Sequence, residues 1–339
     1  MRPRAGPTDG GRAGVVLLQM GGPGSLDEVE PFLRRILSDA EIIRLPRGLR
    51  RFQPVLGAVG ALTRGRTVRP MYAAIGGRSP IAPTTRVLAA RVAGILQEVG
   101  ARIPVTVAMR YSSPRATEAV ATLRSEAVER VVLLPLYPHY SPSTVGSSVN
   151  DFRAAARGAS WEGATTLVPE WGLHPAYQSL LSCWVQSTLD RARQEWEGPW
   201  HLLFSAHGLP KRYVTAGDAY PDRVRAASEA VAARVRGHHA WHLAFQSRMG
   251  SVEWTRPYTG EALKTMGTDG VRSLVTVPMG FVSDHLETLY EIDILYRDIA
   301  RKAGIQRFHR VPAFNEHPDF ARFLANLVLE TLEEDGPGS

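Results

Sequence analysis

Short apolar runs alternate with longer amphipathic segments along nearly the whole chain, and this alternation constrains the fold more than any other feature. The runs are rich in Val, Leu and Ile, as is typical of parallel strands that are covered on both faces. Repeated strand–helix alternation predicts an α/β fold with right-handed crossovers. The predicted strands are 15–20, 103–109, 130–135, 164–168, 201–205, 242–246 and 273–277, and the predicted helices are 26–37, 86–99, 114–126, 176–193, 223–236 and 286–301.

The sequence also repeats itself weakly, which predicts two similar halves joined around 150–170. VVLLQMGGP at 15–23 resembles HLLFSAHGLP at 201–210, because each is an apolar strand that ends in a small-residue turn and a proline. VVLLPLYPHYSPST at 131–144 resembles LVTVPMGFVSDHLET at 274–288 in the same way. Ligands of open parallel sheets bind beyond the carboxyl ends of the strands. All four segments are such ends, so we expect the site in a cleft between the halves.

Composition narrows the class of protein. With 44% hydrophobic and 22% charged residues, a chain of 339 residues is ordinary globular material, enough for about two domains. The net charge of +7 comes from scattered basic residues without a dense basic block, so we expect no nucleic-acid partner. No stretch has the length of a signal-peptide core or a membrane span, which favours a cytoplasmic protein.

The chain has a single cysteine, Cys183. One cysteine excludes an internal disulfide and any zinc or iron–sulfur site that needs several cysteines from the same chain. Cys183 lies in the apolar stretch LLSCWV, which predicts a small buried side chain. This cysteine usage fits a reducing compartment.

His207 is the first candidate for chemistry. It lies in FSAHGLP, directly after a predicted strand and before a glycine turn, so its ring is expected at the carboxyl edge of the sheet. The near-neutral pKa of histidine suits proton transfer or metal ligation. Taken alone, a structural histidine remains the other interpretation.

A second candidate is the acidic segment SDHLETLYEID at 283–293, which also follows a predicted strand. Asp284 and Glu287 have the spacing of a helix N-cap and its acidic partner, and this capping interpretation needs no chemistry. It leaves His285 unexplained, and it also leaves Glu291, which lies four residues beyond Glu287 on the same helix face. Two like charges on one face are unfavourable, so the segment also indicates a cation path or a paired proton acceptor.

Three further segments offer ligand-binding groups, each with a structural alternative. Arg110 and Tyr111 end another predicted strand, and the hydroxyls of PHYSPSTVGSS at 138–148 precede a helix, which together suit carboxylates of a ligand. For each of them taken alone, capping and turn chemistry is the favoured explanation. Trp254 lies in a loop, where its face either stacks on a flat ligand or packs in the interior. The GGPG turn lacks the GxGxxG pattern, and no P-loop, HExxH or GxSxG sequence is present.

Taken together, these segments resemble the ferrochelatase family, whose members insert ferrous iron into a porphyrin. The two most specific signatures are SAHGLP and SDHLETLYEID. The resemblance implies a chelatase-like fold of two Rossmann-type domains, each with a four-stranded parallel sheet flanked by helices. It divides the chain into 14–158, completed by a C-terminal helix at 316–334, and 159–315. The other matching segments are LLQMGGPGSLDEVEPFL, YAAIGGRSPI, MRYSSP, LPLYPHYSPSTVGSS, GDAYPDRV, AFQSRMGSVEWTRPYT and VPMGFVSDHLETLYEIDI.

Residue by residue, the resemblance places the catalytic and iron-binding positions on His207 and on Glu287, which pairs with it across the pocket. Stretch 41–72 matches the lip over the pocket, which touches the bilayer in membrane-associated members. We expect that stretch to form two short helices, or else an ordinary surface excursion. The polar shell falls on Asp284, His285 and Glu291, and the porphyrin-binding positions fall on Met20, Ser79, Arg110, Tyr111 and Trp254.

The chain departs from the family pattern at several positions. Some members hold an iron–sulfur cluster with four cysteines, so none is expected here, and Fe²⁺ is a substrate rather than a bound cofactor. Some members continue the acidic ladder one turn past Glu291, where this chain has Leu295. Members that resemble the mitochondrial enzyme carry Arg before the IGG turn, where this chain has Ala73 and Ala74, so propionate contacts there must differ. Met20 stands where coproporphyrin-using members carry tyrosine, which favours protoporphyrin IX.

The expected reaction is insertion of Fe²⁺ into protoporphyrin IX with release of two pyrrole protons. In this hypothesis His207 accepts a proton or binds iron on one face of a bent ring, and Glu287 acts from the other side. The alternatives are a coproporphyrin III ferrochelatase, a cobalt or nickel chelatase, and a porphyrin or haem carrier without enzymatic activity. The expected location is cytoplasmic, with peripheral contact to the inner face of the membrane through 41–72.

Overall fold

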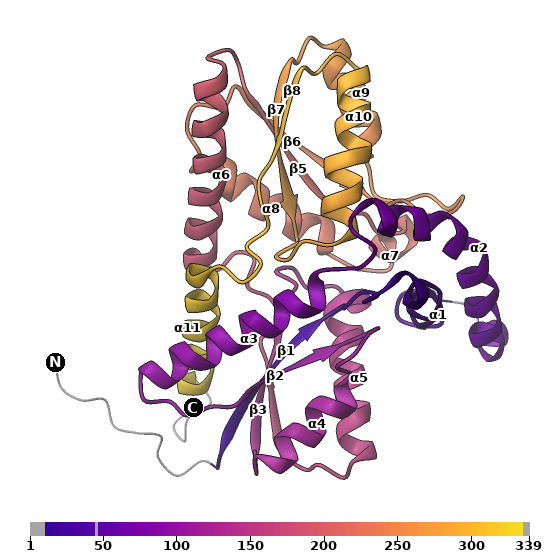
Figure 1. The fold of residues 1–339 in the computed structure, drawn as a ribbon, viewed down its shortest axis with the longest axis vertical. Helices are drawn as coiled ribbons and strands as arrows, with labels where there is room; N and C mark the ends of the chain where they lie inside the picture. The colour runs from indigo at the N-terminus through magenta and orange to yellow at the C-terminus, as the bar shows by residue number, and fades with distance from the viewer. Residues whose placement is uncertain (1–10, 45–46, 335–339) are drawn as a thin grey trace. The chain divides into compact units, whose positions relative to one another are not determined.

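The computed structural model describes residues 11–44 and 47–334 and divides the chain into two compact units. The first unit comprises the chain up to Tyr137, Pro142–Pro169 and the chain from Phe314 onward. The second comprises Pro138–Ser141 and Glu170–Ala313. Each unit contains one four-stranded parallel sheet (Figure 1), so the two-domain α/β prediction is confirmed.

The predicted boundary between 158 and 159 is wrong, and the reason is the last strand of the first sheet. β4 (Ala164–Leu167) pairs with β3 (Arg130–Pro135), with Val132 beside Thr166. A strand belongs to the sheet that satisfies its backbone hydrogen bonds, so the first unit extends past β4.

The first sheet has the strand order β2-β1-β3-β4, with β1 (Ala13–Gln19) between β2 (Val105–Met109) and β3. Val15 to Leu18 are almost completely buried, as expected for a central parallel strand. Helices α3 and α11 pack together on one face, and α4 and α5 pack together on the other (Figure 1). Their bounds are α3 (Ile81–Glu98), α4 (Ala116–Ser125), α5 (Ser147–Gly158) and α11 (Pro318–Glu334).

The second sheet has the equivalent order β6-β5-β7-β8, so β5 holds the position of β1 and β7 holds that of β3. This correspondence confirms the internal repeat. The edge strand β8 was not predicted, because its sequence RFHR contains a single apolar residue. The strands are β5 (His201–His207), β6 (Ala240–Gln246), β7 (Ser273–Met279) and β8 (Arg307–Arg310).

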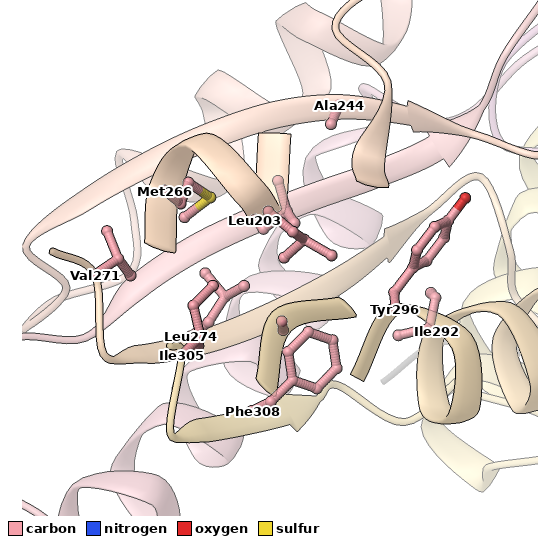
Figure 2. Packing of buried hydrophobic residues seen from close by; sticks show 11 residues of the cluster. Leu203, Ala244, Met266, Val271, Leu274, Ile292, Tyr296, Ile305 and Phe308 are labelled. Atoms are coloured by element: carbon pink, nitrogen blue, oxygen red, sulfur yellow. The ribbon is translucent and has the colours of Figure 1, made fainter. Parts of the chain in front are cut away.

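A buried cluster fixes α9 and α10 on one face of the second sheet (Figure 2). Leu203 and Leu274 of the sheet pack with Met266, Ile292 and Phe308. Burial of each large apolar side chain contributes about 1.5–3 kcal/mol to folding. The helices of this unit are α6 (Pro175–Glu195), α7 (Lys211–Thr215), α8 (Tyr220–Ala232), α9 (Thr259–Thr268) and α10 (Arg297–Lys302), of which α7 and α9 were not predicted.

Cys183 corrects one expectation, because its side chain is exposed on α6. The buried face of this helix includes Leu181, Ser182 and Val185. Cys183 falls between these positions and faces outward, since helical side chains share a face at spacings of three and four. The prediction was wrong because it used the apolar character of the stretch and ignored the position of Cys183 around the helix.

The segment predicted as two short helices contains one long helix instead. α2 (Gln53–Ala74) follows the 3₁₀ segment η2 (Arg47–Phe52) and packs along α1 (Val29–Leu37), which itself follows the short segment η1 (Leu26–Glu28). Positions 45 and 46 of the predicted stretch lie outside the described residues. Pro54 fits the first helical turn, where a missing N–H costs nothing.

Wide π-helical turns follow the equivalent strands β3 and β7. After β3 lies η3 (Pro142–Gly146), and after β7 lies η4 (Glu287–Tyr296), which runs into α10. The predicted regular helix at 286–301 is therefore mostly a π-helix, a form that frequently marks functional sites. Across the described ranges, no helix combines the length and apolar character needed to cross a membrane.

Candidate functional site

His207 and Glu287 lie together at the carboxyl edge of the second sheet. His207 is the last residue of β5, and Glu287 begins the π-helix η4 that follows the neighbouring strand β7. His207 Nδ1 lies 3.0 Å from Glu287 Oε2. The chain leaves β5 for β6 on one side and reaches β7 on the other, so this point is a topological switch, where open α/β sheets bind ligands.

This contact corrects the expectation that the two residues act from opposite sides of a porphyrin. A flat ring needs about 3.5 Å of van der Waals space on each side, so none fits between atoms in direct hydrogen-bond contact. In this arrangement no ring can lie between the two side chains. The reason is local: β5 and β7 are hydrogen-bonded neighbours, and side chains at their ends meet.

The pair is electrostatically matched. Burial raises the pKa of Glu287, but the charge and hydrogen bond of His207 outweigh burial and lower it to about 2. Burial lowers the pKa of His207, and the charges of Glu287 and Glu291 with the Glu287 hydrogen bond raise it above its ordinary value. An ionised carboxylate only accepts hydrogen bonds, so Nδ1 of His207 donates. In the neutral ring Nε2 therefore carries the lone pair.

Glu291 is the second carboxylate of the site. Its Oε2 accepts from Ser247 Oγ at 2.6 Å and from Gln246 Nε2 at 3.0 Å. Burial and the charge of Glu287 raise the pKa of Glu291 to about 7, against the smaller effects of its two hydrogen bonds and of His207. Glu287 and Glu291 thus differ sharply in proton affinity although both are carboxylates on one helix.

Gln246 ties the helix of the two acids to the sheet. It ends β6 beside His207, and its amide group donates to the backbone carbonyl of Glu287 at 3.0 Å. Ser205 Oγ donates to its side-chain oxygen at 2.7 Å, which fixes the orientation of the amide. Sequence reasoning missed Gln246 and Ser247, although both lie at the start of a matched family segment.

The capping interpretation of the acidic segment is wrong. Asp284 Oδ1 accepts from Arg310 at 2.9 Å and from Thr288 Oγ1 at 2.9 Å, and the first turn of η4 has no side-chain cap. Arg310 also holds both carboxylate oxygens of Asp293. Glu287 is directed to His207 instead. Arg310 was missed because it lies on β8, far along the chain in a segment without a recognisable motif.

His285 is buried directly beside the His207–Glu287 pair. Its Nδ1 lies 3.0 Å from the carbonyl oxygen of Ser283 and donates to it, because a carbonyl accepts only. Its Nε2 lies 3.9 Å from Glu287 Oε2, beyond hydrogen-bond distance. Burial lowers the pKa of His285, more than the nearby carboxylates raise it, which favours the neutral ring.

Trp254 packs in the interior, which was the alternative to stacking on a flat ligand. The side chain is buried, its indole N–H donates to the Met249 carbonyl at 2.9 Å, and its ring meets the His207 ring edge-on at 6.0 Å between centroids. This contact helps to hold the imidazole in place. The indole face is covered by protein rather than open to a ligand.

Arg110 and Tyr111 of the first unit belong to a closed network around Asp39. Arg110 donates to Asp39, Asp151 and Ser147 at 2.8, 3.1 and 2.7 Å, and the Tyr111 hydroxyl donates to Asp39 at 2.6 Å. Burial raises the pKa of Asp39, but the donors around it lower it overall. The chain's own carboxylates therefore occupy the groups that were expected to bind a ligand, and sequence reasoning missed Asp39.

The last two predicted pocket residues lie near the end of β1. Ser79 is buried against Gly22, where an added Cβ would meet the serine side chain. Met20 directly follows β1 and is half-buried, and it stands at the position that His207 occupies in the second unit. Within the described residues, no three His, Cys, Asp or Glu side chains surround a common point as a ready-made metal site.

Comparison with known proteins decides the family. The family model described as ferrochelatase matches residues 12–332. The chain belongs to the ferrochelatase family. Ferrochelatases of Synechocystis sp. and Synechococcus elongatus are 40% and 41% identical to it, and each alignment covers 96% of this chain and 84% of the relative.

Solved structures show the same fold at low identity. CbiX, named as the terminal enzyme of sirohaem biosynthesis in denitrifying bacteria, has a TM-score of 0.50 at 15% identity, over 94% of this chain and 98% of its own. SirB from Bacillus subtilis, solved with Fe³⁺, has a TM-score of 0.51 at 13% identity, over 75% and 91%. At these identities the likeness supports the chelatase fold of this ferrochelatase-family chain and nothing finer.

Proposed function

We propose that this chain inserts Fe²⁺ into protoporphyrin IX in haem biosynthesis, with His207 and Glu287 as the catalytic pair. Membership of the ferrochelatase family supports a lyase that metallates a porphyrin. The observation that carries the residue assignment is the 3.0 Å contact of His207 with an ionised Glu287 at the switch point of the second sheet.

The proposed proton transfers follow from the tautomer of His207, whose neutral ring carries its proton on Nδ1. Nε2 of the neutral His207 ring is the base that takes a pyrrole proton, and the carboxylate of Glu287 stabilises the imidazolium that forms. Glu287, with a pKa of about 2, is a poor proton acceptor near neutral pH. Glu291, with a pKa near 7, is the better acceptor of a proton passed onward. Asp284 and His285 hold the surrounding polar groups in place.

Iron enters this account as a substrate. Imidazole nitrogen and carboxylate oxygen both bind Fe²⁺, so His207 offers Nε2 to an ion that is shedding water, and Glu287 becomes a second ligand once its contact with Nδ1 opens. Iron and proton compete for the same Nε2, which separates iron delivery from deprotonation in time. We propose no resident cofactor, since the four cysteines of a cluster cannot come from a chain with one.

Anaerobic incubation with Fe²⁺ and protoporphyrin IX tests the proposal, followed by conversion of the metal-free porphyrin spectrum to that of haem. We expect turnover by the unmodified chain and loss of turnover in His207→Ala. His239→Ala, which removes an exposed histidine at the other edge of the sheet, is the matched control and keeps turnover. Tight porphyrin binding without metallation would refute the enzyme and leave a carrier.

The identity of the porphyrin rests on Met20. A thioether side chain after β1 offers an apolar contact to the macrocycle, where a tyrosine would present a hydroxyl. Parallel assays with coproporphyrin III should show a preference for protoporphyrin IX, and Met20→Tyr should reduce that preference. Faster metallation of coproporphyrin III by the unmodified chain would reverse the assignment.

We also propose a cytoplasmic location with peripheral membrane contact through 41–72. Four apolar side chains are exposed on one side of α2, two of which, Val55 and Leu56, are 63% and 51% exposed. An exposed apolar helix face of this kind suits the interfacial layer of a bilayer. The four side chains are Val55, Leu56, Val59 and Leu62.

Co-sedimentation with liposomes tests the membrane contact. We expect binding by the unmodified chain and weaker binding by Val55→Ser/Val59→Ser, whose side chains are already exposed and so contribute little to folding. Val99→Ser, at an exposed apolar position of the first unit outside α2, is the control. Equal sedimentation of the α2 variant, or no binding to neutral or anionic liposomes, would remove the proposal.

A further inference from the structure

A chain of buried polar side chains runs through the second unit from α9 to the helix of the two acids. Thr259 is the first residue of α9, Ser205 lies within β5, and Gln246 ends β6. No more than 1% of any of these three residues is exposed. Buried polar groups destabilise a fold unless they are hydrogen-bonded, so the partners of these side chains are part of the fold's design.

The hydrogen bonds of the chain run in one direction. Ser205 Oγ lies 2.9 Å from Thr259 Oγ1 and 2.7 Å from Gln246 Oε1. An amide oxygen only accepts, so Ser205 donates its single hydrogen to Gln246. Thr259 is therefore the donor in its contact with Ser205, and each hydroxyl of the chain points toward Gln246.

The amide group of Gln246 fits in one orientation only. Its Nε2 donates both of its hydrogens, one to the backbone carbonyl of Glu287 at 3.0 Å and one to Glu291 Oε2 at 3.0 Å. A rotated amide would turn its oxygen toward these two acceptors and would lose both hydrogen bonds. The hydroxyls of Thr259 and Ser205 favour the observed orientation, because they present a hydrogen to the amide oxygen.

Gln246 holds the two acids in different ways. It binds the main chain of Glu287 and leaves the carboxylate of that residue in contact with His207 Nδ1 at 3.0 Å. It binds the side chain of Glu291 on Oε2, the oxygen that also accepts from Ser247 Oγ. One amide group thus sets where the two carboxylates lie relative to each other and to the end of β5.

The start of η4 depends on such contacts. The π-helix begins at Glu287 without a side-chain cap, so hydrogen bonds from neighbouring elements decide where its first turn lies. A displacement of about 1 Å in a reacting group can reduce a rate by about 10²-fold. A side chain that holds this turn therefore affects chemistry without touching a substrate.

We propose that Thr259, Ser205 and Gln246 are positioning residues for metal insertion, which act through Gln246 on Glu287 and Glu291. The inference rests on the proposed function, and it gives these three residues no contact with porphyrin or iron. They should therefore affect kcat and leave the KM for porphyrin nearly unchanged.

The far end of the chain gives the cleanest test. Thr259→Val removes the hydroxyl at nearly constant size, and kcat should fall about 2–10-fold, as for the loss of one hydrogen bond. Thr259→Ser restores the hydroxyl and should restore kcat. Thr276→Val is the matched control, because Thr276 is a buried threonine of β7 whose hydroxyl has no hydrogen-bond partner among the described residues. Rates are referred to the folded fraction of each protein, measured by circular dichroism.

A double-mutant cycle tests whether the chain acts through Gln246. Gln246→Met keeps the length of the side chain without its hydrogen bonds, and kcat should fall about 10–100-fold. Adding Thr259→Val to Gln246→Met should cost no further activity, because the amide that the threonine supports is already gone. Losses that multiply in the double variant, or a rise in KM instead of a fall in kcat, would overturn the proposal.

A second measurement separates this inference from the proposed function. The proton NMR signal of His207 Nδ1–H, which Glu287 holds, should shift in Gln246→Met and in Thr259→Val but not in Thr276→Val. If the unmodified chain metallates no porphyrin, the proposed function fails and this signal still tests the network. An unchanged signal would refute the network, and Thr259→Val decides the question if Gln246→Met does not fold.

Discussion

The central strands of the two units end in opposite kinds of side chain. β1 leads into Met20, an apolar residue, whereas β5 ends on His207, which is paired with a carboxylate. After β3 the π-turn leads to Ser147, and after β7 it begins with Glu287. The same topology thus supplies two equivalent edges, and of these equivalent positions only those of the second unit carry a paired histidine and carboxylate. The fold determines where a ligand site can lie, and the side chains at that edge determine which reaction the site can support.

The two units also use ion pairs differently. In the first unit Arg110 closes a network with Asp39 and Asp151, and in the second Arg310 closes one with Asp284 and Asp293. In the first network the donors of Arg110 and Tyr111 bind acceptors of the same unit, so the network serves to stabilise that unit. The second holds the segment from which Glu287 reaches His207. We therefore expect damage to the first network to lower stability and damage to the second to lower turnover as well.

The largest effect is expected from Glu287→Gln. The substitution removes the charge that stabilises protonated His207 while keeping the size of the side chain, so turnover should fall by about 10²–10⁴-fold. Initial rates of haem formation measure this. Glu195→Gln is the control, because Glu195 pairs with His309 at 3.1 Å elsewhere in the same unit. Equal rates in the two variants would show that the His207–Glu287 pair matters no more for turnover than an ion pair elsewhere in the unit.

Asp39→Ala should give the next largest effect, on stability. It leaves Arg110 and Tyr111 without their shared acceptor, and removing one partner of a buried pair costs about 3–5 kcal/mol. Urea unfolding measures the free energy of unfolding. Glu126→Gln, which breaks the exposed pair with Arg12, should cost less than about 1 kcal/mol. A loss in Asp39→Ala no greater than in Glu126→Gln would mean that the network does not stabilise the first unit.

Replacing each arginine by lysine sharpens the comparison of the two networks. Lysine keeps the charge but loses the planar fork that holds two carboxylates, so each variant should lose about 1–3 kcal/mol of stability. Only Arg310→Lys should also reduce kcat, because Asp284 lies three residues before Glu287. Steady-state kinetics of both variants provide the measurement, and a similar fall in kcat for Arg110→Lys would contradict the division of roles.

The last and smallest effect on stability is expected from Glu291→Gln, and it should depend on pH. Because the folded pKa of Glu291 is raised from 4.5 to about 7, this group favours folding below pH 4.5, and that contribution is lost as pH rises through 7. Glutamine does not titrate, so the variant should gain stability relative to the unmodified chain at pH 8 and not at pH 4.5. Urea unfolding at both values tests this, and a constant difference between the two proteins would show that Glu291 is not buried as a charge.

Much of the fold could be predicted because it rests on local patterns. The continuous apolar runs identified every strand except β8, whose RFHR sequence has no such run. The repeat identified the equivalence of β1 with β5 and of β3 with β7 before any pairing was known. The long helix α2 was missed because its glycines and prolines mimic a broken segment, while packing against α1 sustains it.

The site could be predicted only in part. His207 was found because it stands where a predicted strand ends, and Glu287 because it lies in the acidic segment after another strand. Their direct contact depends on β5 and β7 being neighbours. Asp39 and Arg310 were missed because they meet their partners through tertiary structure, across 71 and 26 positions of the chain. A single sequence records which side chains are present at strand ends, and the sheet decides which of them touch.

The central claim is that His207 Nδ1 donates to an ionised Glu287 and leaves Nε2 as the base. ¹⁵N NMR of the imidazole nitrogens across a pH titration, with the His207 signals assigned by their loss in His207→Ala, measures this directly. The account predicts a proton on Nδ1 in the neutral ring, and a pKa of His207 that is raised in the unmodified chain and falls in Glu287→Gln. A proton on Nε2 of the neutral ring, or a pKa of His207 that is unchanged by Glu287→Gln, would contradict it.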